Sequence, residues 1–211
     1  NDARRQRQMC IRDSNNPRIG ESPSRYPEIV KNIALIYVQQ GKNEIAIEAI
    51  NQARQIQPDD TGLILNEADL YIRLSNNSNN DEDRKYYRLK FKELMELAIT
   101  KEPEKGILYY NLGVISGEQG EKEDAIKYYE QAISLKPDYV DAYLNLVSQI
   151  LEGEKSIIEE MNNLGTSKSD NLRYDQLKVE REGLYQKCIP YLKNLIEISP
   201  ENLSALNTLK N

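Results

Sequence analysis

Residues 106–137, GILYYNLGVISGEQGEKEDAIKYYEQAISLKP, decide the fold, because their apolar residues recur at the spacing of two amphipathic helices. The small side chains of Gly113 and Ala125 allow two antiparallel helices to approach closely, while larger residues fill the space between them. Gly120 lies in the polar segment between the helices, where it permits the left-handed backbone of a tight turn. Pro137 cannot continue a helix and marks the end of the second one. The stretch therefore predicts a helical hairpin.

The same proline ending recurs along the chain. Pro58, Pro103, Pro137 and Pro200 each follow an amphipathic stretch, and their separations are 45, 34 and 63 residues. The two longer intervals exceed the shortest by 11 and 29 residues, so the register is kept if two copies carry insertions. We therefore expect an array of repeated hairpins.

With its 34-residue interval, the array resembles the tetratricopeptide repeat family. Several residues of the stretch 106–137 stand at the family's positions, namely Tyr109, Leu112, Gly113, Ala125, Tyr129, Ala132 and Pro137. Ser116 departs from the pattern, because the family usually has Tyr at this place. The resemblance implies an all-α fold, a right-handed α-solenoid. In such a solenoid the first helices of successive repeats line a concave groove that binds proteins or peptides.

The register divides the chain into repeats, preceded by an irregular lead-in at 15–26. The expected repeats are 27–60, 61–105, 106–139 and 140–202, followed by the start of a fifth at 203–211. In the second repeat, the insertion at 74–84 belongs to the polar run LSNNSNNDEDRK, which predicts a loop that leads into a lengthened second helix. In the fourth, the extra residues predict two lengthened helices, about 140–162 and 171–198, projecting as an antiparallel hairpin.

The beginning of the chain differs from the rest. Residues 4–14 resemble, residue by residue, the translation of a sequencing adapter used in transposase-based libraries. The alternative is a basic targeting segment, but the stretch lacks the apolar region and cleavage site of one. We therefore leave residues 1–14 out of the functional argument. We expect the chain to be a piece of a longer bacterial protein, with the cytoplasm and the cell envelope both open as its location.

Composition excludes several classes of function. The 211 residues include no histidine and two cysteines, which removes His-based zinc sites and the Ser–His–Asp and Cys–His catalytic arrangements. A net charge of −6 argues against a nucleic-acid surface, which is usually basic. No apolar run approaches the roughly 18 residues that a membrane span needs. We expect no cofactor, no metal, no catalytic residues and no enzymatic activity in this part of the chain.

Four asparagines occupy the same register position in the four expected first helices. They are Asn32, Asn66, Asn111 and Asn145. An asparagine side chain offers a donor and an acceptor, which matches one peptide unit of an extended chain. In the family that these repeats resemble, such a ladder implies that a peptide backbone is bound. Asparagine is also common at this position in tetratricopeptide repeats, so the ladder can equally be a feature of the fold.

Neighbours of the ladder should line the same groove. They are Lys31, Leu35, Leu65, Asp69, Ile72, Arg73, Tyr110, Val114, Leu144 and Ser148. Tyr110 is the best single anchor for a ligand, because aromatic residues dominate binding energies, but it can equally pack against the next repeat. Family members that grip a C-terminal carboxylate use basic residues from several repeats. Lys31 fits that pattern, whereas Ile107 and Asn111 stand where the third repeat needs basic residues. We therefore do not expect this chain to grip a C-terminal carboxylate in that way.

The expected partner is a protein or extended peptide bound in the groove. Two alternatives stay open. The chain could be a structural or oligomeric assembly subunit, including a homo-oligomer, whose contacts use the hairpin at 150–185. It could also be the recruiting arm of a larger enzyme.

Overall fold

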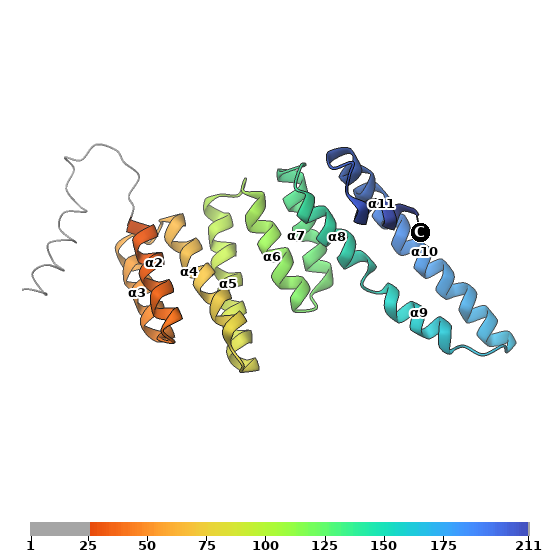
Figure 1. Cartoon of the computed structure of the whole chain (residues 1–211), viewed down its shortest axis with the longest axis horizontal. Coiled ribbons are helices and arrows are strands. Elements are labelled where there is room, and N and C mark those ends of the chain that lie inside the picture. The colour runs from red at the N-terminus through yellow and green to blue at the C-terminus, as the bar shows by residue number, and fades with distance from the viewer. Residues whose placement is uncertain (1–25, 211) are drawn as a thin grey trace, which may run out of the picture. The chain divides into compact units, whose positions relative to one another are not determined.

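A computed structural model describes residues 26–210, and every regular element in that range is an α-helix (Figure 1). The suspected adapter segment and most of the predicted lead-in lie outside the described residues. The described chain forms two compact units, one ending at Lys101 and the other beginning at Glu102. The helices of the first unit are α2 (Tyr26–Gln39), α3 (Asn43–Ile56), α4 (Thr61–Asn77) and α5 (Asp81–Lys101). Those of the second are α6 (Gly106–Glu118), α7 (Lys122–Leu135), α8 (Val140–Leu151), α9 (Glu154–Asn163), α10 (Lys168–Ile198) and α11 (Leu203–Lys210).

The first unit consists of two hairpins, α2–α3 and α4–α5, and α4 also packs on α2 and α3. Small residues such as Ala46 and Ala68 are fully buried, which lets the helices approach closely. Gly41 has a φ of +71°, which suits the turn between α2 and α3. One charged pair lies inside this packing. The guanidinium of Arg54 on α3 donates to the carboxylate of Glu67 on α4 at 2.6 Å, and Glu67 is buried.

The loop expected at 74–84 is much shorter than the sequence predicted. Helix α4 continues to Asn77 and α5 begins at Asp81, so that only residues 78–80 are not helical. The polar run suits the start of a helix. The side-chain oxygen of Asn80 accepts from the backbone N–H of Glu82 at 2.9 Å. Three acidic residues in the first turn of α5 also stabilise the helix, because their negative charges lie at the positive end of the helix dipole.

The second unit begins with the hairpin α6–α7, and α8 packs on α7. Gly120 takes the positive φ, +77°, that the sequence predicted for this turn. Gly113 has a different role, because a Cβ at this position would lie 2.6 Å from a ring carbon of Tyr129. The absence of a side chain therefore lets the ring of Tyr129, which is buried, pack directly on the backbone of α6.

The insertion in the fourth repeat is a helical hairpin, but its first helix is divided. A single helix was expected at about 140–162, whereas α8 ends at Leu151 and α9 begins at Glu154. Gly153 stands at the break, and because glycine has a low helix propensity, an interruption at this residue loses little stability. The second helix, α10, runs without interruption for 31 residues. Figure 1 shows α9 and α10 side by side and running in opposite directions.

Ion pairs join the two arms of this hairpin. Arg173 on α10 donates two hydrogen bonds to Glu160 on α9, at 2.7 and 3.0 Å. Arg181 and Tyr185 both donate to one carboxylate oxygen of Glu154, each at 2.7 Å. At the tip, Ser167 caps α10 through reciprocal hydrogen bonds with Asp170. The hairpin is therefore held mainly by polar contacts, with Leu177 buried among them.

Candidate functional site

The predicted ladder residues lie on the first helices of their hairpins. Asn32 and Asn66 belong to α2 and α4 in the first unit, and Asn111 and Asn145 belong to α6 and α8 in the second. Asn32 is exposed, and the other three are half-buried. Each unit therefore presents two of the four amide side chains on neighbouring first helices.

Predicted groove residues of the first unit form a charged group across α2 and α4. The ammonium group of Lys31 lies 3.9 Å from the carboxylate of Asp69, and the guanidinium of Arg73 lies 3.0 Å from it. Two cations therefore share one carboxylate, so that these three side chains together carry a net charge of +1. Leu35 on α2 is half-buried and adds apolar surface.

In the second unit, Tyr110 lies in a cluster of aromatic rings. Its ring centroid is 5.9 Å from that of Tyr129 and 4.8 Å from that of Tyr139. The amide of Asn145 on α8 donates to its hydroxyl at 3.1 Å. Tyr110 thus packs against the next repeat, which is one of the two roles that the sequence allowed. It is only half-buried, so part of its surface remains open.

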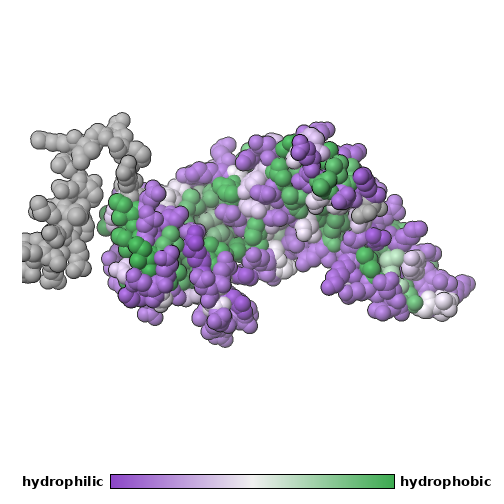
Figure 2. All heavy atoms as spheres, viewed as in Figure 1, coloured by the Kyte–Doolittle hydropathy of each residue, from purple (hydrophilic) through white to green (hydrophobic). Residues whose placement is uncertain are grey.

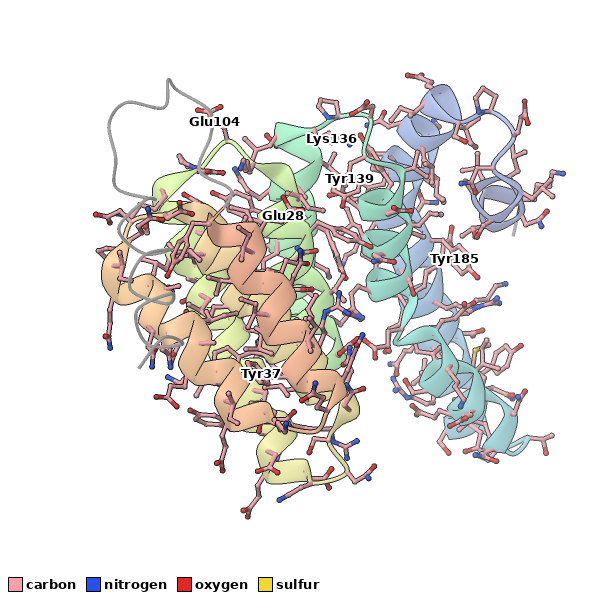
Figure 3. All side chains as sticks on the ribbon, turned by 60° about the vertical axis from the view of Figure 1, so that its left-hand side comes forward. Glu28, Tyr37, Glu104, Lys136, Tyr139 and Tyr185 are labelled. Atoms are coloured by element: carbon pink, nitrogen blue, oxygen red, sulfur yellow. The ribbon has the colours of Figure 1, made fainter. Side chains whose placement is uncertain are left out.

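Burial governs the acidity of these rings. It raises the pKa of Tyr110, and the nearby carboxylate of Asp141 adds to this effect while the bond from Asn145 opposes it. Burial also raises the pKa of Tyr129 and of Tyr139 to about 12. The ammonium group of Lys136 lies 4.8 Å from the ring centroid of Tyr139, and Figure 3 shows both side chains at the turn between α7 and α8. The cluster is therefore neutral and well packed at physiological pH.

Val114 and Leu144, both predicted to line the groove, pack against the core of the second unit and are half-buried. Leu144 also borders a surface pocket of about 550 Å³ together with Ser148, another predicted groove residue. We call this hollow the α8–α11 pocket, because residues of both α8 and α11 line it, together with residues of α9 and Leu192 of α10. Figure 2 shows hydrophobic residues at the surface among hydrophilic ones in the region of α8 and α11.

Most of the α8–α11 pocket was missed by sequence reasoning. Ile158 and Glu159 come from α9, and Ser204 and Thr208 come from α11. The positions of Ile158 and Glu159 depend on the break at Gly153, which no repeat register contains. The spacing of Leu144, Ser148 and Leu151 along one face of α8 was the available signal.

A second hollow of about 330 Å³ lies on α10 between α9 and α11, and it shares Leu192 and Thr208 with the first. Burial would raise the pKa of Glu154, but hydrogen bonds from Tyr185 and Arg181 outweigh it and hold that pKa below its usual value.

Within residues 26–210, no three His, Cys, Asp or Glu side chains gather in a way that could hold a metal ion. In the same range, no helix is both long and apolar enough to cross a membrane.

The sequence matches family models for the tetratricopeptide repeat at residues 107–139 and 32–60. The Photosystem I assembly protein Ycf3 of Rippkaea orientalis is 30% identical over 117 residues, which are 54% of this chain and 58% of that protein. The Protein O-mannosyl-transferase TMTC1 of Mus musculus is 30% identical over 122 residues, which are 57% of this chain and 12% of that protein. The chain thus matches less than two thirds of the length of either relative.

Two solved structures have a similar fold. A thermophilic tetratricopeptide repeat protein of Thermus thermophilus gives a TM-score of 0.54 at 16% identity, covering 87% of this chain and 79% of that one. MamA gives a TM-score of 0.53 at 20% identity, covering 84% of this chain and 80% of its own. These likenesses confirm the fold class predicted from the sequence, an all-α solenoid of helical hairpins.

Proposed function

Because the chain is a tetratricopeptide repeat protein, we propose that it is a scaffold that binds other proteins through extended peptide segments. The first-helix surfaces of both units would make the contacts, α2 with α4 and α6 with α8. The observation that carries the proposal is the equivalent placement of Asn32 and Asn66 in one unit and Asn111 and Asn145 in the other, none of them buried. Amide side chains at a regular spacing can hydrogen-bond successive peptide units without reading the peptide's own side chains.

The surroundings of the ladder support this proposal. In the first unit, Lys31 and Arg73 place positive charges beside the ladder, and Leu35 adds apolar surface there. In the second unit, the half-buried side chains of Tyr110 and Val114 provide apolar surface beside the ladder. An extended peptide needs this combination, because backbone hydrogen bonds position it and burial of its apolar side chains supplies most of the affinity.

The experiment begins with random twelve-residue peptides displayed on phage and selected on the purified chain. Selected peptides are then measured by fluorescence anisotropy on a triple variant, Asn66→Ala, Asn111→Ala and Asn145→Ala. We expect the triple variant to lose at least about tenfold in affinity while keeping its helical circular dichroism. The matched control replaces three exposed asparagines away from the ladder, Asn76→Ala, Asn171→Ala and Asn194→Ala. Equal affinity of the triple variant and the wild type would contradict the proposal.

A second measurement tests whether the peptide backbone is what the ladder recognises. Methylation of backbone nitrogens in a selected peptide removes donors without changing its side chains. We expect methylation at one or two positions to abolish binding, while methylation outside the bound segment has no effect. If no single methylation weakens binding, the ladder does not read the backbone.

One observation favours a second candidate function, assembly through the hairpin of α9 and α10. Leu172 and Val179 lie seven residues apart on one face of α10 and are 62% and 69% exposed. An assembly subunit could bury these side chains against a partner or a second copy. Sedimentation velocity of the wild type and of the double variant Leu172→Ser and Val179→Ser tests this role. Loss of a self-associated species in the double variant would support it, and a monomeric wild type would exclude self-assembly.

A further inference from the structure

The α8–α11 pocket has an apolar interior. Val147, Leu192 and Ala205 are buried beneath it, whereas Leu144 and Leu151 are half-buried and Ile158 is 37% exposed. The last three therefore present apolar surface inside a concave site of about 550 Å³. This volume lies within the range that binding sites usually have.

The rim of the pocket is acidic on one side. Three carboxylates border it, Glu152, Glu154 and Glu159, against one amine, Lys155. Glu154 is paired with Arg181, and Glu159 lies 3.9 Å from Lys155. The carboxylate of Glu152 is exposed and accepts a hydrogen bond from the amide of Gln149, a neutral group, at 2.9 Å. The α8–α9 side of the rim thus keeps a negative charge.

The part of the lining that α11 supplies carries no charge. Helix α11 contributes the hydroxyl groups of Ser204 and Thr208 and the methyl group of Ala205. The pocket therefore has one acidic edge, one neutral edge that can form hydrogen bonds, and an apolar floor. A ligand that matches all three features carries an apolar group with a positive charge to one side of it.

We propose that the α8–α11 pocket binds an aliphatic or aromatic side chain of a partner peptide that carries Lys or Arg within the next four residues. The apolar side chain fills the pocket against Leu144, Leu151 and Ile158, and the basic residue lies against Glu152. This inference rests on the proposed function, peptide binding, and adds the chemistry of the peptide that is bound. It follows from the insertion, because α9 supplies Ile158 and much of the acidic edge.

The test uses the same displayed peptide library. Wild-type protein is compared with Ser148→Phe, which places a ring at the pocket from an exposed position on α8. Its control is Ser134→Phe at an exposed position on α7. We expect the selected peptides to be enriched in an apolar residue followed by Lys or Arg within four positions. These peptides should bind Ser148→Phe at least about tenfold more weakly and Ser134→Phe with unchanged affinity.

The charge is tested separately with Glu152→Gln and, as a control, Glu123→Gln, an exposed carboxylate on α7. Both variants change the net charge by the same amount. We expect Glu152→Gln alone to weaken binding by about threefold at low salt, and the difference to shrink in high salt. Equal effects of the two variants would show that only overall charge matters and would overturn the basic half of the inference.

The outcomes separate this inference from the proposed function. Peptides that bind Ser148→Phe as well as the wild type but lose affinity for the triple asparagine variant would overturn the inference and leave the proposed function standing. Selected peptides without the apolar–basic pair would also overturn it. If the wild type selects no peptide, both fall together.

Discussion

The amide nitrogen of Asn145 on α8 donates a hydrogen bond to the hydroxyl of Tyr110 on α6, with 3.1 Å between the two atoms. The bond joins the first helices of consecutive repeats. A residue that the sequence marks as a ligand contact is thus also part of the packing between repeats. Both roles are compatible, because the side chain of asparagine has an acceptor besides the donor used in this bond.

Tyr110→Phe removes that bond and keeps the ring. We expect it to lower the free energy of unfolding by about 1 kcal/mol, the usual net worth of one hydrogen bond. Affinity for selected peptides should not fall, because the side chain of Asn145 itself is unchanged. Tyr110→Ala also removes the ring packed against Tyr129 and Tyr139, and we expect a loss of about 3 kcal/mol. Urea denaturation followed by circular dichroism measures both values, and equal losses in the two variants would refute this account.

Gly113→Ala tests the close packing of α6 on α7. The added Cβ would lie 2.6 Å from Tyr129, so the ring or the helix must move, at a cost of about 1–3 kcal/mol in unfolding free energy. Gly183→Ala is the matched control, because it is also within a helix and nothing lies within 4 Å of the added Cβ. We expect the control to stabilise the protein by up to about 1 kcal/mol through helix propensity. The same sign for both changes, measured by urea denaturation, would show that the contact with Tyr129 is unimportant.

The pair of Arg54 and Glu67 tests how a buried charge contributes to the first unit. Arg54→Ala leaves the buried carboxylate of Glu67 without its 2.6 Å partner, and we expect a loss of about 3–5 kcal/mol in unfolding free energy. The double variant Arg54→Met and Glu67→Met replaces the pair with apolar groups and should recover most of that loss. Thermal and urea denaturation of the single and double variants measures the difference. A double variant that is less stable than Arg54→Ala would contradict the prediction.

The bonds to Glu154 predict how acid affects the hairpin. Its pKa is lowered in the folded state, so the unfolded state takes up a proton first as the pH falls below about 4.5. The stability that this carboxylate contributes is therefore fully present above that pH and is lost as the pH falls through the folded pKa. Glu154→Gln should melt at a lower temperature than the wild type at pH 7, and the gap should shrink once the pH is below 4.5 and close as the pH falls through the folded pKa. A gap that is independent of pH would show that the charge of Glu154 is not what matters.

Sequence reasoning predicted the fold class, an all-α array of helical hairpins, because each hairpin is encoded locally. The spacing of small residues, Gly120 at the turn and Pro137 at the helix end all act within one hairpin. It misjudged the run at 74–84 because polarity alone does not distinguish a loop from a capped helix start. It also missed the break at Gly153, although a glycine in a polar stretch was visible there.

The candidate site was predictable only in part. Register placed the four asparagines on first helices, because equivalent positions in a repeat point the same way. The pairing of Asn145 with Tyr110 joins residues 35 apart in the sequence, and that of Lys31 with Asp69 depends on how α2 packs against α4. Such contacts follow from tertiary packing, which has no short-range signal. The α8–α11 pocket likewise exists only once the insertion has folded back.

The uninterrupted course of α10 has a mechanical consequence. At 1.5 Å per residue, its 31 residues extend over about 45 Å, and the half that is farther from the hairpin tip carries Cys188, Leu192 and Leu195 into the core. A helix is stiff along its axis, so a force applied at the tip is transmitted along α10 to those buried side chains. Pro190 lies inside the helix and cannot donate the usual backbone hydrogen bond, which makes it the most compliant joint along the arm. Leu192, which lines both pockets, lies two residues beyond this joint.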